Sequence, residues 1–430
     1  MKSYKSTVEF LFSLQNFGIK LGLENIESLL NIFGNPHRQF PSIHIAGTNG
    51  KGSTAAMLSA VLTCAGYKTG LYTSPHLFDF RERIRINGIQ IPENKLIGYT
   101  PQIQNFVSQN HITFFECTTA TAFKYFADEK VDIAIIETGL GGRLDATNII
   151  SPLLSIITNI SIEHQEHLGN TIENIAAEKG GIIKKNVPCI TGSENTIAIT
   201  ILKKICKEKR AKFYQAHSIV KIAERHIGIN KNIYEIKSKQ FNSNNLQVSL
   251  GGFYQSKNIP VVLSALNVLS KSNNKSEFKF KISANNINEG LNNIQAFTGI
   301  YGRFEIMRRQ PLIVCDVAHN PDAILKLSYS VQQLFPKRGM VVFGVMKDKN
   351  IDEMLLVLKK LNLPVIAVQP KTERALSSKE IVHKCHSLGI SCFHGGEVQN
   401  GVNFGLSRIS KDEFLLVCGS FYVAAELKKI

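Results

Sequence analysis

Short apolar runs alternate with helical stretches along residues 42–160, and each run ends in polar or glycine-rich residues. Buried strands of a parallel sheet consist of continuous apolar segments, so this pattern predicts an α/β domain built on a parallel sheet. Residues 54–65, rich in Ala, Leu and Met, predict a helix packed on that sheet. The predicted strands are residues 43–46, 69–72, 131–136 and 153–158.

A second series of apolar runs begins near Arg303 and predicts a smaller, Rossmann-like α/β domain. Its predicted strands are residues 312–315, 340–343, 365–368 and 414–417. The Asn- and Lys-rich segments 224–250 and 271–293 are interpreted as surface insertions or the approach to a linker. We therefore place the first domain at residues 1–297 and the second at residues 298–430.

The composition is that of a globular protein. A chain of 430 residues has room for roughly two to four domains, and 43% hydrophobic with 20% charged residues excludes a disordered or fibrous chain. No apolar run approaches the ~20 residues of a membrane span, and residues 1–14 lack a signal-peptide cleavage site. Eight scattered cysteines without a Cys-x-x-Cys pair indicate neither a disulfide framework nor a zinc knuckle. We expect a soluble, unprocessed, cytoplasmic protein.

The chain is strongly basic, with 50 Lys and Arg against 34 Asp and Glu, a net charge of +16. Such a field attracts polyanions, whether nucleic acid, nucleotide or an acidic small substrate. The lysines are dispersed among Asn and Ile, however, and no basic stripe is interleaved with stacking aromatic residues. We therefore expect a small anionic ligand and no nucleic acid.

Residues 43–54, Ile-His-Ile-Ala-Gly-Thr-Asn-Gly-Lys-Gly-Ser-Thr, are the most informative stretch. A strand, a glycine-rich turn and a helix place backbone N–H groups around an anion, and Lys51 adds a point charge for phosphates. The spacing departs from the usual Walker pattern, because Lys51 lies four residues after Gly47 and Gly52 precedes Ser53. A simple glycine turn is the alternative, but the pattern favours a P-loop ATPase domain.

A nucleoside triphosphate requires Mg²⁺, which prefers oxygen ligands near the carboxyl ends of parallel strands. The strand that begins at Val131 ends in Glu137, the first predicted metal ligand. The glycine-rich stretch 138–148 that follows is interpreted as a substrate loop. After the next strand, His164 is the second predicted ligand, whereas His167 is interpreted as a surface helix residue because no zinc-ligand spacing is present.

In the second domain, the strand 312–315 ends in a polar turn that carries Asp316 and His319. These side chains are expected to face whatever lies between the domains. A helix cap is the alternative role for Asp316.

Ten segments together resemble the folylpolyglutamate synthase / dihydrofolate synthase family of Mur-ligase-like, ATP-dependent amide ligases. They include Tyr-Thr-Ser-Pro-His-Leu at 72–77, Phe-Phe-Glu at 114–116 and Gly-Arg-Phe-Glu at 302–305. The full set, in the family's order, is 18–24, 47–54, 72–77, 82–84, 113–116, 137–148, 178–182, 302–305, 316–321 and 419–420.

The resemblance implies ATP-dependent ligation of L-glutamate to a folate or pteroate through an acyl phosphate, in a cleft between the domains. It implies phosphate and ATP contacts from Asn49, Gly50, Lys51, Gly52, Ser53, Asn258, Arg303 and Asp316. It implies two Mg²⁺ sites, with ligands Ser74, Glu137, His164 and a carbamylated Lys179. The implied folate pocket contains Gly22, Phe115, Leu144, Asp145 and Ala146.

Lys51, Lys179 and, as a weak candidate base, His319 are the implied catalytic residues. The chain departs from the family at Tyr254, where His is usual, at Tyr301, where Pro is usual, and at Asn350, where Asp is usual. The expected partners are ATP, L-glutamate and a folate or dihydropteroate, with neither a membrane nor a second subunit. The alternatives are a Mur-type amino-acid ligase of cell-wall synthesis and a nucleotide-binding switch without ligase activity.

Overall fold

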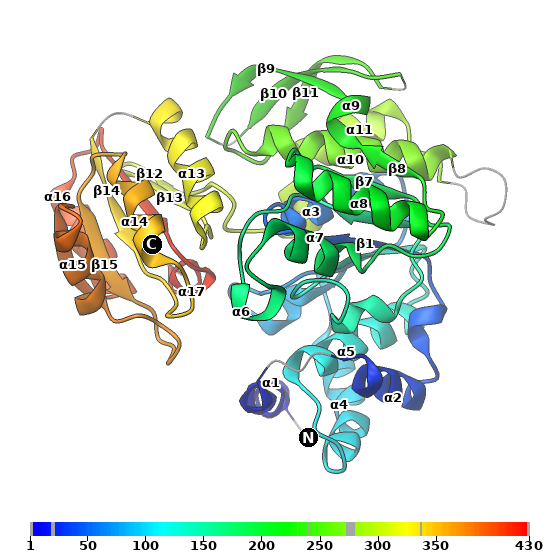
Figure 1. Cartoon of the computed structure of the whole chain (residues 1–430). Coiled ribbons are helices and arrows are strands. Elements are labelled where there is room, and N and C mark those ends of the chain that lie inside the picture. Colours follow the sequence, from blue (N-terminus) through cyan, green and yellow to red (C-terminus); the bar gives the residue numbers. More distant parts are fainter. Residues whose placement is uncertain are drawn as a thin grey trace. The chain divides into compact units, whose positions relative to one another are not determined.

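The structure, a computed structural model, describes residues 3–18, 22–229, 231–239, 241–271, 280–335 and 338–427 (Figure 1). The chain forms two compact units. The first consists of Met1–Ile222, Ile236–Ser243 and Lys257–Gly299, and the second of Ala223–Glu235, Asn244–Ser256 and Ile300–Ile430. The division made from the sequence assigns 223–235 and 244–256 to the first domain, whereas the structure places them in the second unit. None of the helices in the described ranges has both the length and the apolarity to cross a membrane.

The first unit is built on an eight-stranded sheet in the order β4-β3-β2-β5-β1-β6-β7-β8. The strands from β2 to β8 in this order are parallel, and β3 and β4 add an antiparallel edge. The four strands predicted for this domain are confirmed, with ends that shift by about two residues. The strands are β1 Ser42–Ala46, β2 Thr69–Tyr72, β3 Ile84–Ile86, β4 Ile89–Gln90, β5 Ile133–Glu137, β6 Leu154–Ile157, β7 Cys189–Thr191 and β8 Phe213–Gln215.

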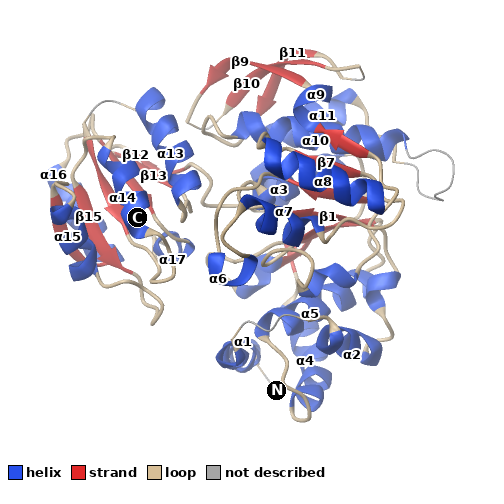
Figure 2. Ribbon diagram, viewed as in Figure 1, coloured by secondary structure: helices blue, strands red, loops and turns tan. Residues whose placement is uncertain are grey.

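Helices surround this sheet, which Figure 2 shows in red. The α-helices are α1 Tyr4–Ser13, α2 Glu24–Ile32, α3 Lys51–Cys64, α4 Glu93–Val107, α5 Phe114–Asp128, α6 Gln165–Leu168, α7 Ile172–Gly180, α8 Thr196–Glu208, α9 Ala216–Ile219, α10 Gln255–Lys271, α11 Ala284–Asn292 and α12 Ile294–Thr298. Four 3₁₀ turns lie at Leu14–Phe17, Pro36–Arg38, Phe80–Arg83 and Ala146–Ile149.

Helix α3 is apolar on all sides because both its faces are covered. It begins at Lys51, three residues before the predicted start, and is buried from Gly52 to Leu62. Helix α11 approaches it so closely that a Cβ at Gly290 would lie 2.6 Å from Val61 Cα. The expectation of a surface insertion is therefore wrong for the α11 part of segment 271–293, while 272–279 lie outside the described residues.

The described residues of segment 224–250 contain regular structure, which the composition did not predict. They form a three-stranded sheet in the order β11-β10-β9, with β9 Lys221–Ile227, β10 Asn232–Lys237 and β11 Ser243–Val248. Tyr234, Ile236, Leu246 and Val248 are fully buried or nearly so. Many polar residues of this segment lie on the exposed strand β9 and at the exposed positions of β11, while Asn232 and Glu235 of β10 are buried. The apolar positions therefore do not stand out in the sequence.

The second unit contains a six-stranded sheet in the order β12-β13-β17-β14-β15-β16, parallel except for the edge strand β12. The four predicted strands are confirmed, and the sequence analysis missed the half-exposed edge strands β12 and β16. The strands are β12 Glu305–Arg309, β13 Leu312–Cys315, β14 Gly339–Phe343, β15 Val365–Gln369, β16 Cys392–Glu397 and β17 Phe414–Cys418. The helices are α13 Pro321–Leu334, α14 Ile351–Lys359, α15 Ser378–Ser387, α16 Val398–Arg408 and α17 Phe421–Ala425.

Candidate active site

The glycine-rich turn between β1 and α3 has the geometry of an anion-binding loop. Gly47 and Gly50 have φ of 145° and 89°, in a region that favours glycine. A Cβ at Gly47 would overlap Thr158 Oγ1, and one at Gly50 would overlap Asn258 Oδ1. Both glycines are therefore required by close approach as well as by backbone conformation.

The residues after β6 hold this turn in place. The Asn49 N–H donates to Asn159 Oδ1 at 2.6 Å, and the Thr48 N–H donates to Asn159 O at 2.9 Å. Lys51 Nζ donates to the Gly47 and Thr48 carbonyls at 3.0 and 3.1 Å, so its ammonium group lies over the turn. The positive end of α3 and this ammonium group are the features expected of a phosphate site, and the phosphate contacts themselves stay a prediction.

Asn258, predicted from the resemblance alone, lies against this turn. It belongs to α10, is 8% exposed, and its amide packs on Gly50. The structure thus brings Asn258 together with Asn49, Gly50 and Lys51 of the predicted ATP-binding set.

Lys179 lies under the same turn and is not a solvated helix residue. Its Nζ donates to Gly47 O at 2.9 Å and pairs with Glu163 Oε1 at 3.2 Å, and the two side chains are 2% and 6% exposed. Burial lowers the pKa of Lys179, while the charge of Glu163 opposes that shift. Sequence reasoning missed Glu163, although its carboxylate comes next to His164 shortly after a strand end, where ligands gather.

Two of the predicted metal ligands are neighbours. Glu137 ends β5, is 4% exposed, and its Oε2 accepts a hydrogen bond from the Ser74 N–H at 3.2 Å. His164 has a left-handed backbone (φ 48°) immediately before α6, and His167 is exposed on α6, as interpreted. The described residues contain no group of three or more His, Cys, Asp or Glu side chains with metal-ligand spacing. The oxygen donors of Ser74 and Glu137 fit Mg²⁺, and the complete ligand set stays a prediction.

The predicted folate residues Phe115 and Asp145 meet at the loop after β5. A Cβ at Gly139 would lie 2.5 Å from the Phe115 ring, so the ring packs directly on the loop backbone. Asp145 Oδ2 accepts from the Gly139 and Leu140 N–H groups, both at 2.8 Å. Burial raises the pKa of the Asp145 carboxyl, and the hydrogen bonds donated to it oppose that rise.

The other predicted folate residues contribute less to this arrangement. Leu144 is half-buried and Ala146 is buried, next to Asp145 in the same loop. Gly22 has φ 148°, and residues 19–21 of its motif lie outside the described residues.

In the second unit, Asp316 is a buried acceptor and not a helix cap. It accepts from Tyr254 Oη at 2.6 Å, from the Phe304 N–H at 2.9 Å and from the Ala318 N–H at 2.8 Å. The N-cap of α13 is Asn320, whose side chain accepts from the Ala323 N–H. Tyr254, the departure from the family pattern, is thus the hydroxyl partner of a predicted ATP-binding residue.

Arg303 and His319 both lie next to the ring of Phe421. The Arg303 guanidinium is 5.2 Å from the Phe421 ring centroid, and the His319 ring centroid is 5.6 Å from it. His319 Nδ1 is 2.9 Å from Val317 O, which fixes the orientation of its ring. The structure therefore groups Arg303 and His319 around α17.

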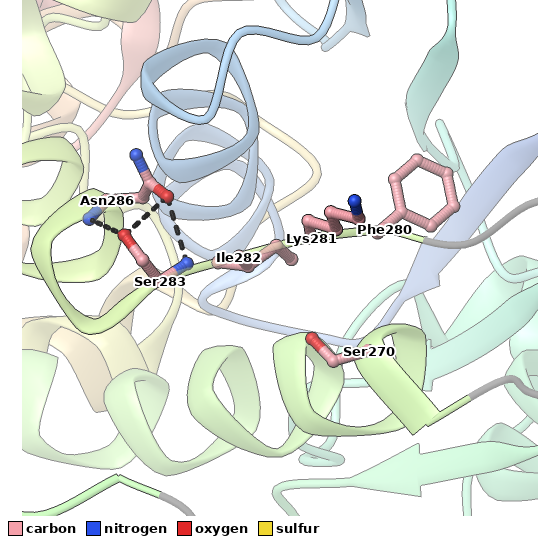
Figure 3. Close-up of a pocket in the computed structure, with 6 residues that line it drawn as sticks. All are labelled: Ser270, Phe280, Lys281, Ile282, Ser283 and Asn286. Atoms are coloured by element: carbon pink, nitrogen blue, oxygen red, sulfur yellow. Dashed lines mark hydrogen bonds between the residues drawn. The ribbon is translucent and has the colours of Figure 1, made fainter.

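A cavity of about 470 Å³ lies elsewhere in the first unit (Figure 3). Its lining contains no predicted site residue and consists of Ser270, Phe280, Lys281, Ile282, Ser283 and Asn286. The candidate site is thus defined by the loops at the ends of β1, β5 and β6 and not by this cavity.

Two family models match the chain in succession. Residues 45–266 match the Mur ligase middle domain, and residues 302–421 match the glutamate ligase domain of Mur ligases. The fold and the phosphate turn therefore define a protein of the Mur ligase class.

The individual relatives narrow this class. The chain is 31% identical to the dihydrofolate synthase/folylpolyglutamate synthase of Bacillus subtilis, over 99% of both chains. It is 34% identical to a probable dihydrofolate synthetase of Schizosaccharomyces pombe, over 95% of this chain and 98% of that one. The solved structure of Escherichia coli FolC in complex with DHPP and ADP is 28% identical, with a TM-score of 0.86 over 98% of this chain and 96% of that one. The protein belongs to the folylpolyglutamate synthase/dihydrofolate synthase family, which confirms the predicted family and α/β fold class.

Proposed function

We propose that the protein joins L-glutamate to the carboxylate of a folate or pteroate, using ATP and releasing ADP and phosphate. One observation carries this proposal: β1 and β5 are parallel neighbours, with Ile45 opposite Glu137. The glycine-rich turn after β1 and the loop after β5, which contains Asp145 and packs against Phe115, therefore leave the sheet side by side. A site for phosphate and a site for an aromatic acceptor are then adjacent. The related E. coli protein has been solved with both ADP and DHPP bound, which supports the assignment.

The chemistry follows from the weak reactivity of a carboxylate. ATP converts the acceptor carboxylate to an acyl phosphate, and the amine of glutamate then displaces phosphate to form the amide. Lys51 leaves the carbonyls of Gly47 and Thr48 to neutralise charge on the transferred phosphoryl group. Ser74, Glu137 and His164 would hold Mg²⁺, which would supply further positive charge to the phosphates. The remaining ATP contacts are assigned to Gly52, Ser53, Asn258, Arg303 and Asp316, and His319 is a candidate base for the glutamate amine.

Carbamylation of Lys179 is part of the proposal. Only a neutral amine reacts with CO₂, and the burial that lowers the Lys179 pKa favours the neutral form. A carbamate would turn the attraction between Lys179 and Glu163 into repulsion of two buried anions. A second Mg²⁺ would relieve this repulsion, so the modification and the second metal site are expected to occur together.

The proposal also covers the role of each domain, the oligomeric state and the cellular location. Residues 1–297 are assigned to ATP and acceptor binding and residues 298–430 to a glutamate ligase domain, acting as a monomer without nucleic acid. A cytoplasmic location is supported by all eight cysteines being free.

The test is ADP release by the purified protein with ATP, Mg²⁺, L-glutamate and either dihydropteroate or tetrahydrofolate. We expect release to depend on both glutamate and one acceptor. ADP release without either substrate would favour a nucleotide switch, and a requirement for a cell-wall precursor in place of the pteroate would favour a Mur-type ligase of cell-wall synthesis.

A further inference from the structure

A histidine lies in the middle of the central strand. His44 of β1 is fully buried, opposite Ile136 of β5 on one side and Ser155 of β6 on the other. Burial lowers the pKa of His44 to about 3, and the charge of Lys184 acts in the same direction. The imidazole is therefore neutral, so its two ring nitrogens have different roles, one as a donor and one as an acceptor.

The hydrogen bonds around Thr147 assign those roles. Thr147 Oγ1 donates to Asp145 Oδ1 at 2.5 Å, and His44 Nε2 lies 2.8 Å from the same Oγ1. A hydroxyl group has one hydrogen, so Thr147 must accept the bond from His44. His44 then carries its proton on Nε2. Its Nδ1 has no hydrogen-bond partner among the described residues, which suits an unprotonated nitrogen because a buried N–H without a partner is rare.

The Asp145 carboxylate accepts further hydrogen bonds from its own loop. Asp145 Oδ1 also accepts from the Thr147 N–H at 3.0 Å, and its Oδ2 accepts from the Gly139 and Leu140 N–H groups. Every bond to the carboxyl group is thus donated to it, which fits an ionised carboxylate with both oxygens in use. The loop bends around this carboxylate at the place where the Phe115 ring packs on Gly139.

We propose that His44 and Thr147 are positioning residues that hold the Asp145 carboxylate, and with it the loop 139–146, in the shape that binds the pteroate acceptor. The inference rests on the proposed function for the identity of the ligand. His44 acts from inside the sheet and touches no substrate itself. The buried hydroxyl of Thr147 thereby sets the affinity of this loop for the pteroate acceptor.

The test uses Thr147→Val, which keeps the shape of the side chain and removes the hydroxyl. Dissociation constants for dihydropteroate and for ADP are measured by calorimetry on the full chain. Losing a buried hydrogen bond to a charged group should weaken dihydropteroate binding about ten- to a hundredfold, with ADP binding changed by less than about threefold. Thr147→Ser should restore most of the affinity. The control is Thr100→Val, which removes another buried threonine hydroxyl, bonded to Leu96 O within α4, and should leave both constants unchanged.

A second measurement does not depend on any variant folding. Nitrogen NMR of the wild-type protein labelled at histidine reports which ring nitrogen carries the proton at each histidine, and we expect the resonances assigned to His44 to be those of a neutral ring protonated on Nε2. A signal for His44 protonated on Nδ1, or unchanged dihydropteroate affinity in a folded Thr147→Val protein, would overturn the inference. If the wild-type protein binds no pteroate at all, the proposed function fails, and the NMR result still decides the order of donors.

Discussion

The buried His44 predicts how stability depends on pH. Its pKa is lowered to about 3 in the folded protein, against 6.5 for an unburied histidine. Between these values the unfolded chain binds a proton that the folded chain does not, so the free energy of unfolding falls as the pH falls. The contribution is fully present above about pH 6.5 and is lost progressively toward pH 3. At pH 5, about 1.5 units below the unfolded pKa, the loss amounts to about 2 kcal/mol.

Urea unfolding followed by circular dichroism at pH 7 and pH 5 measures this loss. The comparison is with His44→Gln, whose amide does not titrate and still has an N–H to donate toward Thr147. The wild-type protein should lose about 2 kcal/mol more than the variant between the two pH values. The matched control is His226→Gln, which replaces an exposed histidine of β9 and should follow the wild-type pH dependence.

Equal pH dependence of wild type and His44→Gln would refute the reasoning. It would mean that the core accommodates an imidazolium at pH 5, so Nδ1 would carry a proton as well and the neutral state assigned to His44 would be wrong.

Lys51→Ala should reduce turnover by about 10²–10³-fold with an unchanged circular dichroism spectrum, and near wild-type turnover at saturating ATP would exclude the phosphate assignment. Asp316→Ala should lower the melting temperature, because three donors lose their acceptor, and should also raise KM for ATP; an unchanged KM would leave only a structural role. Lys179→Ala should be nearly inactive and partly rescued by acetate. The rescue should be best in combination with Glu163→Gln, because this second change removes the buried carboxylate that loses its Lys179 partner. Rescue by an alkylamine would contradict carbamylation.

Local patterns were sufficient to find four strands of each large sheet and the glycine-rich turn after β1. A parallel sheet buries its strands on both faces, so runs such as 43–46 and 414–417 are visible as apolar segments. The edge strand β16 was missed because its exposed positions carry polar residues and glycines, and β9 was missed for the same reason. Strand β10 was missed although it is mostly buried, because Asn232 and Glu235 are among its buried residues.

The contacts between distant segments could not be read from the chain. Glu163 meets Lys179 across sixteen positions, and Tyr254 reaches Asp316 from a segment that sequence order places in the other domain. Neither pairing has a spacing that marks it, because strand order and loop conformation determine which side chains approach.

The amino-acid sequence by itself predicted a P-loop ATPase domain, since a strand, a glycine turn and a lysine at a helix start are local features with local physical causes, and the resemblance of ten ordered segments predicted the family. Only the tertiary structure decided what individual residues do. His44 reads in the sequence as one polar position in an apolar strand. It becomes a neutral donor because the fold places Thr147 within 2.8 Å of its Nε2 and excludes water from both. Protonation state, partner and orientation depend on burial and on neighbours more than a hundred residues away, and these exist only once the sheet has formed.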